Sequence, residues 1–190
     1  MNQHPTRHNI KAGHGESVES DIQHSRYRDS QSGTLLGKLQ YRQAVPSDIP
    51  AMAQIRAREW GTREYWTGRV GGYMSGTLHP QRALPPRVAY VALEGTTVVA
   101  FIAGHLTRRF QCDGELEWIN VVPEHRKSGI ASVLLRLLAE WFVGQQALRV
   151  CVDVDPDNLA ARRFYNRHGA VDLNPHWLVW KDIGIVLREM

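Results

Sequence analysis

The sequence lacks any long apolar segment. None of its 190 residues falls in a run approaching the roughly 18 apolar residues that a membrane-spanning helix needs. The first residues, Met-Asn-Gln-His-Pro, also lack the apolar stretch of a secretory signal peptide. These absences argue against a membrane protein, and they make a cytoplasmic location the default expectation.

Cysteine is scarce, with only Cys112 and Cys151 in the chain. The sequence around these two cysteines does not fit a metal site, and a reducing compartment would leave both as thiols. Cys151 stands in an apolar segment, where we expect a small core hydrophobe. No metal is therefore expected.

The chain also lacks a basic run with interleaved aromatic residues, the pattern typical of nucleic-acid-binding surfaces. Its formal net charge is +4. A polyanionic cofactor explains this modest excess more simply, because several cations belong to two short motifs: Arg126, Lys127, Arg162, Arg163 and Arg167. No nucleic-acid partner is expected.

Large apolar residues are almost absent from the first 34 residues, where four Lys/Arg and four Asp/Glu cancel. The few apolar side chains of this segment cannot bury enough surface to offset the entropy cost of ordering it. Four irregularly spaced histidines argue against a metal site: His4, His8, His14 and His24. We expect a polar extension over 1–34 and one domain over 35–190, whose core the 43% apolar content can fill.

Apolar periodicity and turn residues predict the secondary structure. Strands are expected at 39–45, 87–93, 97–106, around Glu115 and Glu117, and at 147–154, 170–174 and 177–182. Helices are expected from an N-cap at Ser47 to Trp60, and over 62–74, the second broken by Gly68, Gly71 and Gly72. A further helix, ending near Gly144, has an apolar stripe: Ile130, Val133, Leu134, Leu137, Leu138, Trp141 and Phe142. Antiparallel strands followed by alternating strands and helices indicate a mixed α/β three-layer domain.

The most informative segment is the loop Arg126-Lys127-Ser128-Gly129-Ile130-Ala131, between an apolar strand and a helix. The first N–H groups of a helix are unpaired and its dipole is positive there, so such a loop binds anions. It lacks the Gly-Lys-Ser/Thr of nucleoside-triphosphate loops and the glycines of the dinucleotide fingerprint. The loop therefore predicts a different kind of phosphate site.

Two motifs resemble those of the GNAT superfamily of acyl-CoA-dependent N-acyltransferases. Arg126-x-x-Gly129-x-Ala131 is similar to its pyrophosphate loop, and the preceding Val121-x-Pro123-x-x-Arg126 is similar to its strand exit. Downstream, 158–170 (Asn-Leu-Ala-Ala-Arg-Arg-Phe-Tyr-Asn-Arg-His-Gly-Ala) resembles Asn-x-x-Ala-x-x-Phe-Tyr-x-x-x-Gly-Phe, with alanine in the last place. Their order and spacing match the family.

The resemblance implies a GNAT-like three-layer α/β/α domain, with a mixed, mostly antiparallel sheet splayed at the cofactor site. It implies an N-acetyltransferase that passes an acetyl group from the co-substrate acetyl-CoA to a primary amine by direct attack. The amine would belong to a small molecule, a peptide or a protein. A non-catalytic module of the same fold that binds acyl-CoA is the alternative.

The resemblance also assigns cofactor contacts. The pyrophosphate would bind backbone N–H groups of the loop, and the pantetheine would bond the strand exit as an added strand does. Asn158 has two interpretations, a helix cap or a contact to the pantetheine. The predicted contacts are Val121, Val122, Arg126, Lys127, Ser128, Gly129, Ile130, Ala131, Ser132, Asn158 and Tyr165.

Tyr165 matches the family's tyrosine that faces the CoA sulfur. A phenol with a pKa near 10 stays protonated at neutral pH and can give its proton to a thiolate. The alternative is that Tyr165 joins a core-facing stripe with Ala161, Phe164 and His168.

Glu115 and Glu117 match positions where family members carry a general base. Being two apart, they project from one face of the strand, and like charges raise the pKa of one of them. Their alternation with apolar neighbours fits a half-exposed strand equally well. Three histidines are expected to be ordinary surface or loop residues: His105, His125 and His176.

An aromatic set lies where the family binds its acceptor: Trp60, Tyr65, Trp66, Tyr73, His176, Trp177 and Trp180. It fits either an apolar, cation-friendly pocket or core and dimer interface. The chain has little sequence after its last strand to cover a sheet edge, and bare edges are usually covered. We therefore expect a homodimer.

Overall fold

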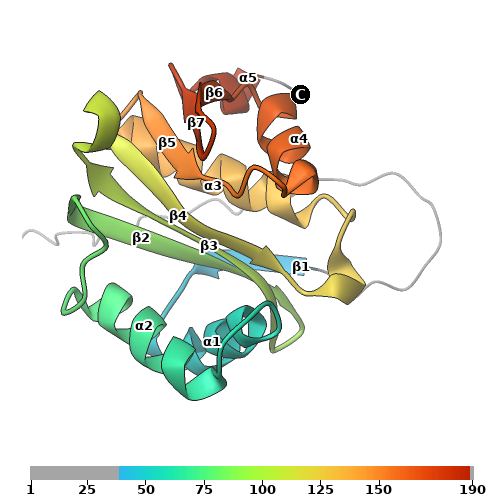
Figure 1. Ribbon diagram of the computed structural model, residues 1–190. Helices are drawn as coiled ribbons and strands as arrows, with labels where there is room; N and C mark the ends of the chain where they lie inside the picture. The colour runs from blue at the N-terminus through green and yellow to red at the C-terminus, as the bar shows by residue number, and fades with distance from the viewer. Residues whose placement is uncertain (1–38, 189–190) are drawn as a thin grey trace, which may run out of the picture. The chain divides into compact units, whose positions relative to one another are not determined.

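A computed structural model describes residues 39–188, which form one sheet with helices on both faces (Figure 1). The predicted extension over 1–34, with its histidines, lies outside the described residues. Within residues 39–188, no helix has both the length and the apolar character needed to cross a membrane.

The described part of the chain forms seven strands and five α-helices. The strands are β1 Leu39–Gln43, β2 Ala83–Glu94, β3 Thr97–Thr107, β4 Gly114–Val121, β5 Val150–Asp153, β6 Val171–Asn174 and β7 Trp177–Trp180. The helices are α1 Ile49–Ala57, α2 Arg63–Ser75, α3 Ile130–Gly144, α4 Leu159–Arg167 and α5 Ile185–Arg188. Short 3₁₀ turns lie at Pro46–Asp48, Arg109–Gln111 and Pro123–His125.

The sheet runs in the order β1-β2-β3-β4-β5-β7-β6, and β4 with β5 is its one parallel pair within residues 39–188. Helices α1 and α2 cover one face, and α3 covers the other (Figure 1). Helix α4 reaches the start of α3, where His168 Nε2 lies 3.1 Å from Ser132 Oγ. The predicted three-layer fold with a mixed, mostly antiparallel sheet is confirmed.

The first helix differs from its prediction at both ends. It begins at Ile49, and Asp48 rather than Ser47 precedes it. The Asp48 carboxylate accepts hydrogen bonds from the Val45 N–H at 2.8 Å and from Arg42 at 2.6 and 2.9 Å. The helix ends at Ala57, before Trp60. Asp48 is thereby tied to β1, and the helix begins at the next residue.

The predicted break in the second helix is wrong. Helix α2 is continuous, and the Thr62 side chain caps it by accepting from the Tyr65 N–H at 3.2 Å. Gly72 serves packing, because a Cβ there would lie 2.8 Å from the Leu78 Cβ. This glycine permits close approach rather than ending the helix.

Helix α3 packs against the sheet through most of its predicted stripe. Leu134, Leu138 and Phe142 are buried. Val133 is 40% exposed, however, and Leu135 is buried instead, so the contact face is rotated from the predicted one. Phe142 sits over β4, where a glycine makes room for its ring.

The last strand pair is followed by α5, which adds cover that the sequence pattern did not predict. Its Val186 is buried, and Ile185 packs against Gly169. The sheet edge on this side is the four-residue β6, whose Val171 is 47% exposed. The homodimer stays a prediction.

Replacing Gly114 with alanine should destabilise the fold, because the new Cβ would lie 2.3 Å from Phe142 Cε1. Overpacking of this kind costs about 1–3 kcal/mol. Gly144→Ala is the matched control, since its Cβ would meet no atom within 4 Å. Urea titration should give a lower free energy of unfolding for Gly114→Ala, and an unchanged or higher one for Gly144→Ala. Equal effects of the two substitutions would contradict this packing.

Candidate active site

Strands β4 and β5 separate toward their carboxyl ends. They pair only through residues 114–116 and 150–152. Strand β4 then continues to Val121, whereas β5 ends at Asp153. A cavity of about 400 Å³ lies there, lined by residues of β4, β5, α1, α4 and the loop before α3.

The loop before α3 carries a row of free backbone N–H groups. Lys127 and Gly129 have left-handed backbone conformations, with φ of 63° and 85°, and α3 starts at the next residue, Ile130. Within residues 39–188, the N–H groups of 127–131 donate to no backbone or side-chain acceptor. The Ser132 N–H differs, because it donates to the Gly129 carbonyl at 3.0 Å. Five consecutive donors are thus available to an anion.

Arg126 lies at the edge of the cavity. Its Nε donates to the Val121 carbonyl at 3.1 Å, and its guanidinium also donates to Glu59 at 2.7 Å. The guanidinium is about half exposed, so a ligand can reach it. Arg126 therefore occupies the carbonyl that the sequence analysis assigned to the cofactor.

The two valines predicted to bind the cofactor differ in their backbone bonding. The Val122 N–H donates to the Val99 carbonyl at 2.9 Å, and its own carbonyl accepts from the His125 N–H at 3.0 Å. Backbone groups alternate along a strand, so Val121 directs its N–H and carbonyl away from β3. Val121 is consequently the residue of the pair whose backbone faces away from β3, and its carbonyl is bonded by Arg126.

A β-bulge in β4 sets the position of Glu117. Trp118 pairs with Ala103 and Leu116 with Gly104, so the residue between them has no partner on β3. Bulges redirect side chains and are frequent beside active sites. The polar ends of Glu117, Glu115 and His105 all lie within 4.8 Å of one another. The structure thus brings both predicted carboxylates together.

The Glu117 carboxyl is largely withdrawn from water. Burial raises its pKa above the ordinary value, and the charge of Glu115 adds to the rise. The charged or polar neighbours that oppose the rise are His105, Arg69 and Arg56. A carboxylate whose pKa is raised toward neutrality suits a proton acceptor.

Glu115, by contrast, is held by an ion pair. It is buried, and it accepts from Arg109 Nε at 3.0 Å and from Thr107 Oγ1 at 3.4 Å. The Glu115 carboxylate is thus already paired with a neighbouring cation. Within residues 39–188, no cation lies within salt-bridge distance of Glu117, which makes it the better candidate.

The prediction that His105 is a surface or loop residue is wrong. It lies on β3 and is completely buried, whereas His176 is exposed as expected. Helices cover both faces of β3, so nearly every side chain of that strand is buried and no alternation marks the position. A histidine ending such an apolar run is the one signal that could have identified it.

Tyr165 lies on α4 and lines the cavity. It is 4% exposed, and its ring packs edge-on against Trp180 at 5.7 Å between centroids. Burial raises the pKa of its phenol, which keeps the proton in place at neutral pH. Tyr165 therefore both packs in the core and faces the cavity.

Asn158 caps α4, because its Oδ1 accepts from the Ala161 N–H at 3.1 Å. This is one of its two predicted roles. Asn158 also lines the cavity, so contact with a cofactor there stays a prediction.

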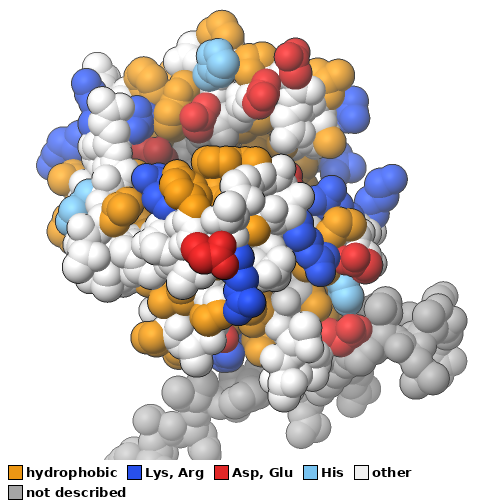
Figure 2. Space-filling view, turned by 60° about the horizontal axis from the view of Figure 1, so that its bottom comes forward, with side chains coloured by type: hydrophobic (Ala, Val, Ile, Leu, Met, Phe, Trp, Pro, Cys, Tyr) orange, Lys and Arg blue, Asp and Glu red, His pale blue; other side chains and the backbone are white. Residues whose placement is uncertain are grey.

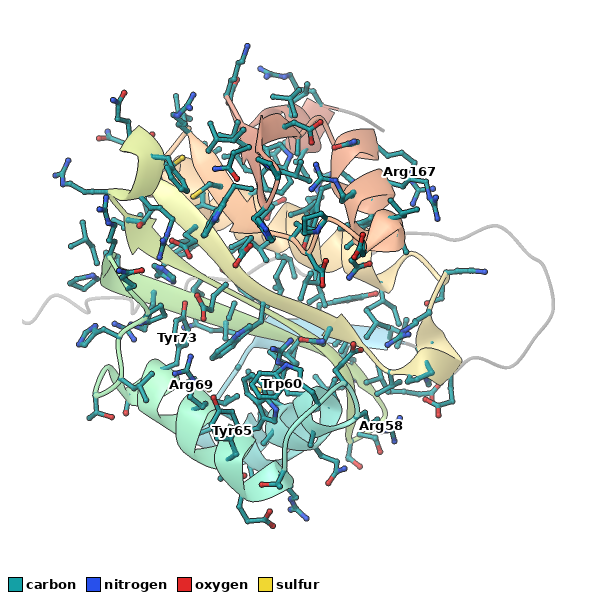
Figure 3. The ribbon with its side chains drawn as sticks, viewed as in Figure 1. Arg58, Trp60, Tyr65, Arg69, Tyr73 and Arg167 are labelled. Carbon is teal, nitrogen blue, oxygen red and sulfur yellow. The ribbon has the colours of Figure 1, made fainter. Side chains whose placement is uncertain are left out.

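The aromatic set divides into buried and exposed members. Trp66, Tyr73 and Trp180 are buried, and Trp180 packs beside Tyr165 rather than at an acceptor surface. Trp60 and Tyr65 are 56% and 46% exposed, and both lie on the α1–α2 side of the sheet (Figure 3). Hydrophobic and Lys or Arg side chains lie side by side on this face (Figure 2).

Arg56 is a cavity residue that the sequence analysis missed. Its guanidinium carbon lies 4.2 Å from the Trp66 ring centroid and 5.9 Å from that of Trp118. Its NH1 donates to Asn120 Oδ1 at 3.2 Å. No local pattern marks Arg56, because its partners come from α2 and β4.

Comparison with known proteins gives a family and a fold. Residues 50–170 match the model of the acetyltransferase (GNAT) family. No curated protein sequence matches the chain.

Several solved structures share the fold at low sequence identity. A GNAT-family acetyltransferase from Desulfovibrio desulfuricans is 15% identical with a TM-score of 0.60, covering 75% of this chain and 97% of that one. The PaiA N-acetyltransferase from Thermoplasma acidophilum, solved with coenzyme A, is 14% identical with a TM-score of 0.57 over 76% and 99% of the chains. An aminoglycoside 6′-N-acetyltransferase from Acinetobacter haemolyticus is 16% identical with a TM-score of 0.60 over 71% and 92%.

Replacing Glu117 with glutamine should stabilise the protein at neutral pH. The pKa of this carboxyl is higher in the folded chain than in the unfolded one. Its stabilising contribution is therefore complete below the unfolded pKa of about 4.3 and is lost as pH rises through the folded pKa. The free energy of unfolding of Glu117→Gln should exceed the parent's by more at about pH 7 than at about pH 4.

Urea titrations at both pH values measure this difference, with Glu140→Gln on the exposed side of α3 as the control. The control should show no comparable growth of the difference with pH. A Glu117→Gln difference that shrinks as pH rises would show that the carboxylate is stabilised, not destabilised, by its surroundings.

Proposed function

The chain belongs to the GNAT family of acetyltransferases, and we propose that it transfers an acetyl group from acetyl-CoA to a primary amine by direct attack. The observation that carries the proposal is a cavity that is lined by a desolvated carboxylate and lies next to five N–H donors without an acceptor within residues 39–188. The donors suit the cofactor's phosphates, and the carboxylate suits an amine that must lose a proton.

The pyrophosphate of CoA would dock on the loop before α3. The free N–H groups of 127–131 converge at the positive end of the helix dipole, with Arg126 and Lys127 adding charge. Gly129 has no atom within 4 Å of where a Cβ would stand, so a phosphate can approach its backbone.

The pantetheine arm would lie along the open edge of β4, as an added strand does. Its amide N–H would replace Arg126 Nε as the donor to the Val121 carbonyl. The displaced guanidinium, already half exposed, would then be free to bind a phosphate oxygen. Arg126 would in this way couple arm binding to pyrophosphate binding.

The transfer then needs two proton movements. Glu117 accepts a proton from the acceptor's ammonium group, directly or through a water, and the freed amine lone pair attacks the thioester carbonyl. The carbon–nitrogen bond forms, the carbon–sulfur bond breaks, and the departing thiolate takes the proton of Tyr165. The raised pKa of each group supports its role, because Glu117 must accept a proton and Tyr165 must hold one.

The acceptor would enter from the side of α1 and α2, where Trp60 and Tyr65 are exposed. Structures of this fold include an aminoglycoside acetyltransferase and the ribosomal-protein-S18-alanine N-acetyltransferase from Escherichia coli. The chemistry common to those acceptors is an amine, so we propose an amine on a small molecule, a peptide or a protein.

A turnover panel tests transfer itself against the alternative of a binding module without catalysis. The full chain is incubated with acetyl-CoA and single amines, amino acids, peptides and aminoglycosides, and mass spectrometry detects acetylated product beside released CoA thiol. CoA binding with no acetylated amine across the panel would favour the module.

Replacing Gly129 with glutamate should abolish CoA binding, because it places bulk and negative charge where the pyrophosphate docks. Gly76→Glu is the matched control, since Gly76 also has a left-handed backbone, with φ of 77°, and no atom near its Cβ, and it lies at the end of α2. Calorimetric titration should show CoA binding to the parent and to Gly76→Glu, and none to Gly129→Glu. A parent chain that binds no CoA at millimolar concentration would end the proposal.

Replacing Tyr165 with phenylalanine should lower kcat by about 10²–10⁴-fold while leaving CoA affinity nearly unchanged. The ring that packs on Trp180 is kept, and only the hydroxyl is lost. Tyr41→Phe on the edge strand β1, which does not line the cavity, is the control. Steady-state kinetics with an acceptor from the panel measures both. Unchanged turnover in Tyr165→Phe would remove Tyr165 from the mechanism.

A further inference from the structure

His105 lies directly behind the proposed base. It pairs with Glu115 across β3 and β4, and its side chain is completely buried. Its Nδ1 is 3.2 Å from the Tyr73 hydroxyl on α2. Its Nε2 is buried and has no hydrogen-bond partner within residues 39–188. Burying a polar atom without a hydrogen-bond partner costs free energy, so the position of Nε2 needs an explanation.

The surroundings of Nε2 determine which nitrogen carries the hydrogen. Nε2 is 3.7 Å from Glu115 Oε2, and the Glu117 carboxylate belongs to the same cluster. A lone pair directed at two carboxylates would be repelled, whereas an N–H is attracted to them. The imidazole therefore carries its hydrogen on Nε2, and the Tyr73 hydroxyl donates to Nδ1. Burial raises the pKa of Tyr73, which keeps that hydroxyl protonated.

Glu115 is already paired with Arg109, and the Glu117 carboxyl lies within 4.8 Å of the imidazole but beyond salt-bridge distance, so a small movement would bring Glu117 to the free Nε2–H. We propose that His105, oriented by Tyr73, is a positioning residue that holds the Glu117 carboxylate toward the acceptor amine and stabilises its charged, proton-accepting form. The inference rests on the proposed role of Glu117. It adds to that role a chain of polar groups from Tyr73 on α2 through His105 on β3 to Glu117 on β4.

Charged and titratable groups face Glu117 from each element packed around it: Arg56 on α1, Arg69 and Tyr73 on α2, His105 on β3 and Glu115 on β4. Burial and Glu115 disfavour the charged carboxylate, while the arginines and His105 favour it. Arg56 is bonded to Asn120 and stacked on aromatic rings. Removing the His105 donor should therefore leave a carboxylate that protonates more readily.

The consequence for the reaction is that Glu117 is already ionised when the acceptor arrives. When the ammonium arrives, its N–H bond breaks and a Glu117 O–H bond forms, which leaves a neutral amine and a neutral carboxylic acid. The Nε2–H of His105 keeps Glu117 ionised beforehand, at a pH where the buried carboxyl would otherwise hold a proton already.

Two substitutions at His105 separate the functions of its nitrogens. The amide nitrogen of glutamine can take the place of Nε2, whereas that of asparagine falls near Nδ1 and leaves no donor toward Glu117. Chain labelled with ¹³C at the glutamate carboxyl carbons is titrated by NMR, without cofactor or acceptor. The Glu117 signal is assigned by its loss in Glu117→Gln.

The midpoint of the Glu117 signal should rise by about one pH unit in His105→Asn, the shift expected for losing a hydrogen bond to a charged group. In His105→Gln it should stay near the parent value. Tyr73→Phe, which keeps the ring and the packing, should give a smaller rise and a mixture of imidazole tautomers in ¹⁵N-histidine spectra. With an acceptor from the panel, the acid limb of kcat/KM should move by the same amounts.

An unchanged midpoint in His105→Asn would overturn the proposal, as would equal shifts in the asparagine and glutamine variants. If His105→Asn does not fold, Tyr73→Phe decides, and an unchanged Glu117 midpoint there also overturns it. Stoichiometric Zn²⁺ binding that moves the Glu117 and His105 signals together would assign the cluster to a cation instead. Because the titration needs no turnover, a chain without transferase activity would leave its result standing.

Discussion

The separation of β4 from β5 is the constraint on which the rest of the site depends. The strands share three residue pairs, and β5 then ends while β4 continues. After the pairing ends, the Val154 N–H donates to the His176 carbonyl at 2.7 Å, so the chain is diverted toward the β6–β7 turn. The edge of β4 near Val121 is left without a strand partner. A sheet edge inside a protein needs something to bond it, and in our account the pantetheine of CoA does so.

The separation also decides which groups are desolvated. Pairing at the amino-terminal end of β4 buries Glu115 beside Arg109, and the bulge just beyond it turns Glu117 into the cluster with His105. Two carboxylates on one strand thus differ in their surroundings, because Glu115 has an ion pair with Arg109 and Glu117 has no ion pair within residues 39–188. Burying Glu117 costs stability in the charged form. A cost of that kind, paired with a nearby phosphate site, is typical of functional positions.

The sequence predicted the parts of this site that are local in the chain. The loop of 126–131, the α4 motif and the succession of strands and helices along the chain all rest on short patterns, and the fold they predicted is confirmed. Register lies beyond such patterns: the bulge at Glu117, the burial of His105 and the stacking of Arg56 depend on elements far apart in the chain. Ser47 shows the same limit, because the helix begins one residue later than this favourable cap residue predicts, after Asp48. Residue roles at the site stay predictions for the same reason.

The most direct test of the central claim is amide hydrogen exchange of the full chain with and without saturating CoA. The account predicts slower exchange at two places together, the N–H of Val121 on the open edge of β4 and the N–H groups of 127–131 before α3. The N–H groups of 127–131 have no acceptor within the described residues, and the Val121 N–H faces away from β3. Protection of the loop without β4 would mean that the arm lies elsewhere. No change at either place, or protection confined to other segments, would contradict the account.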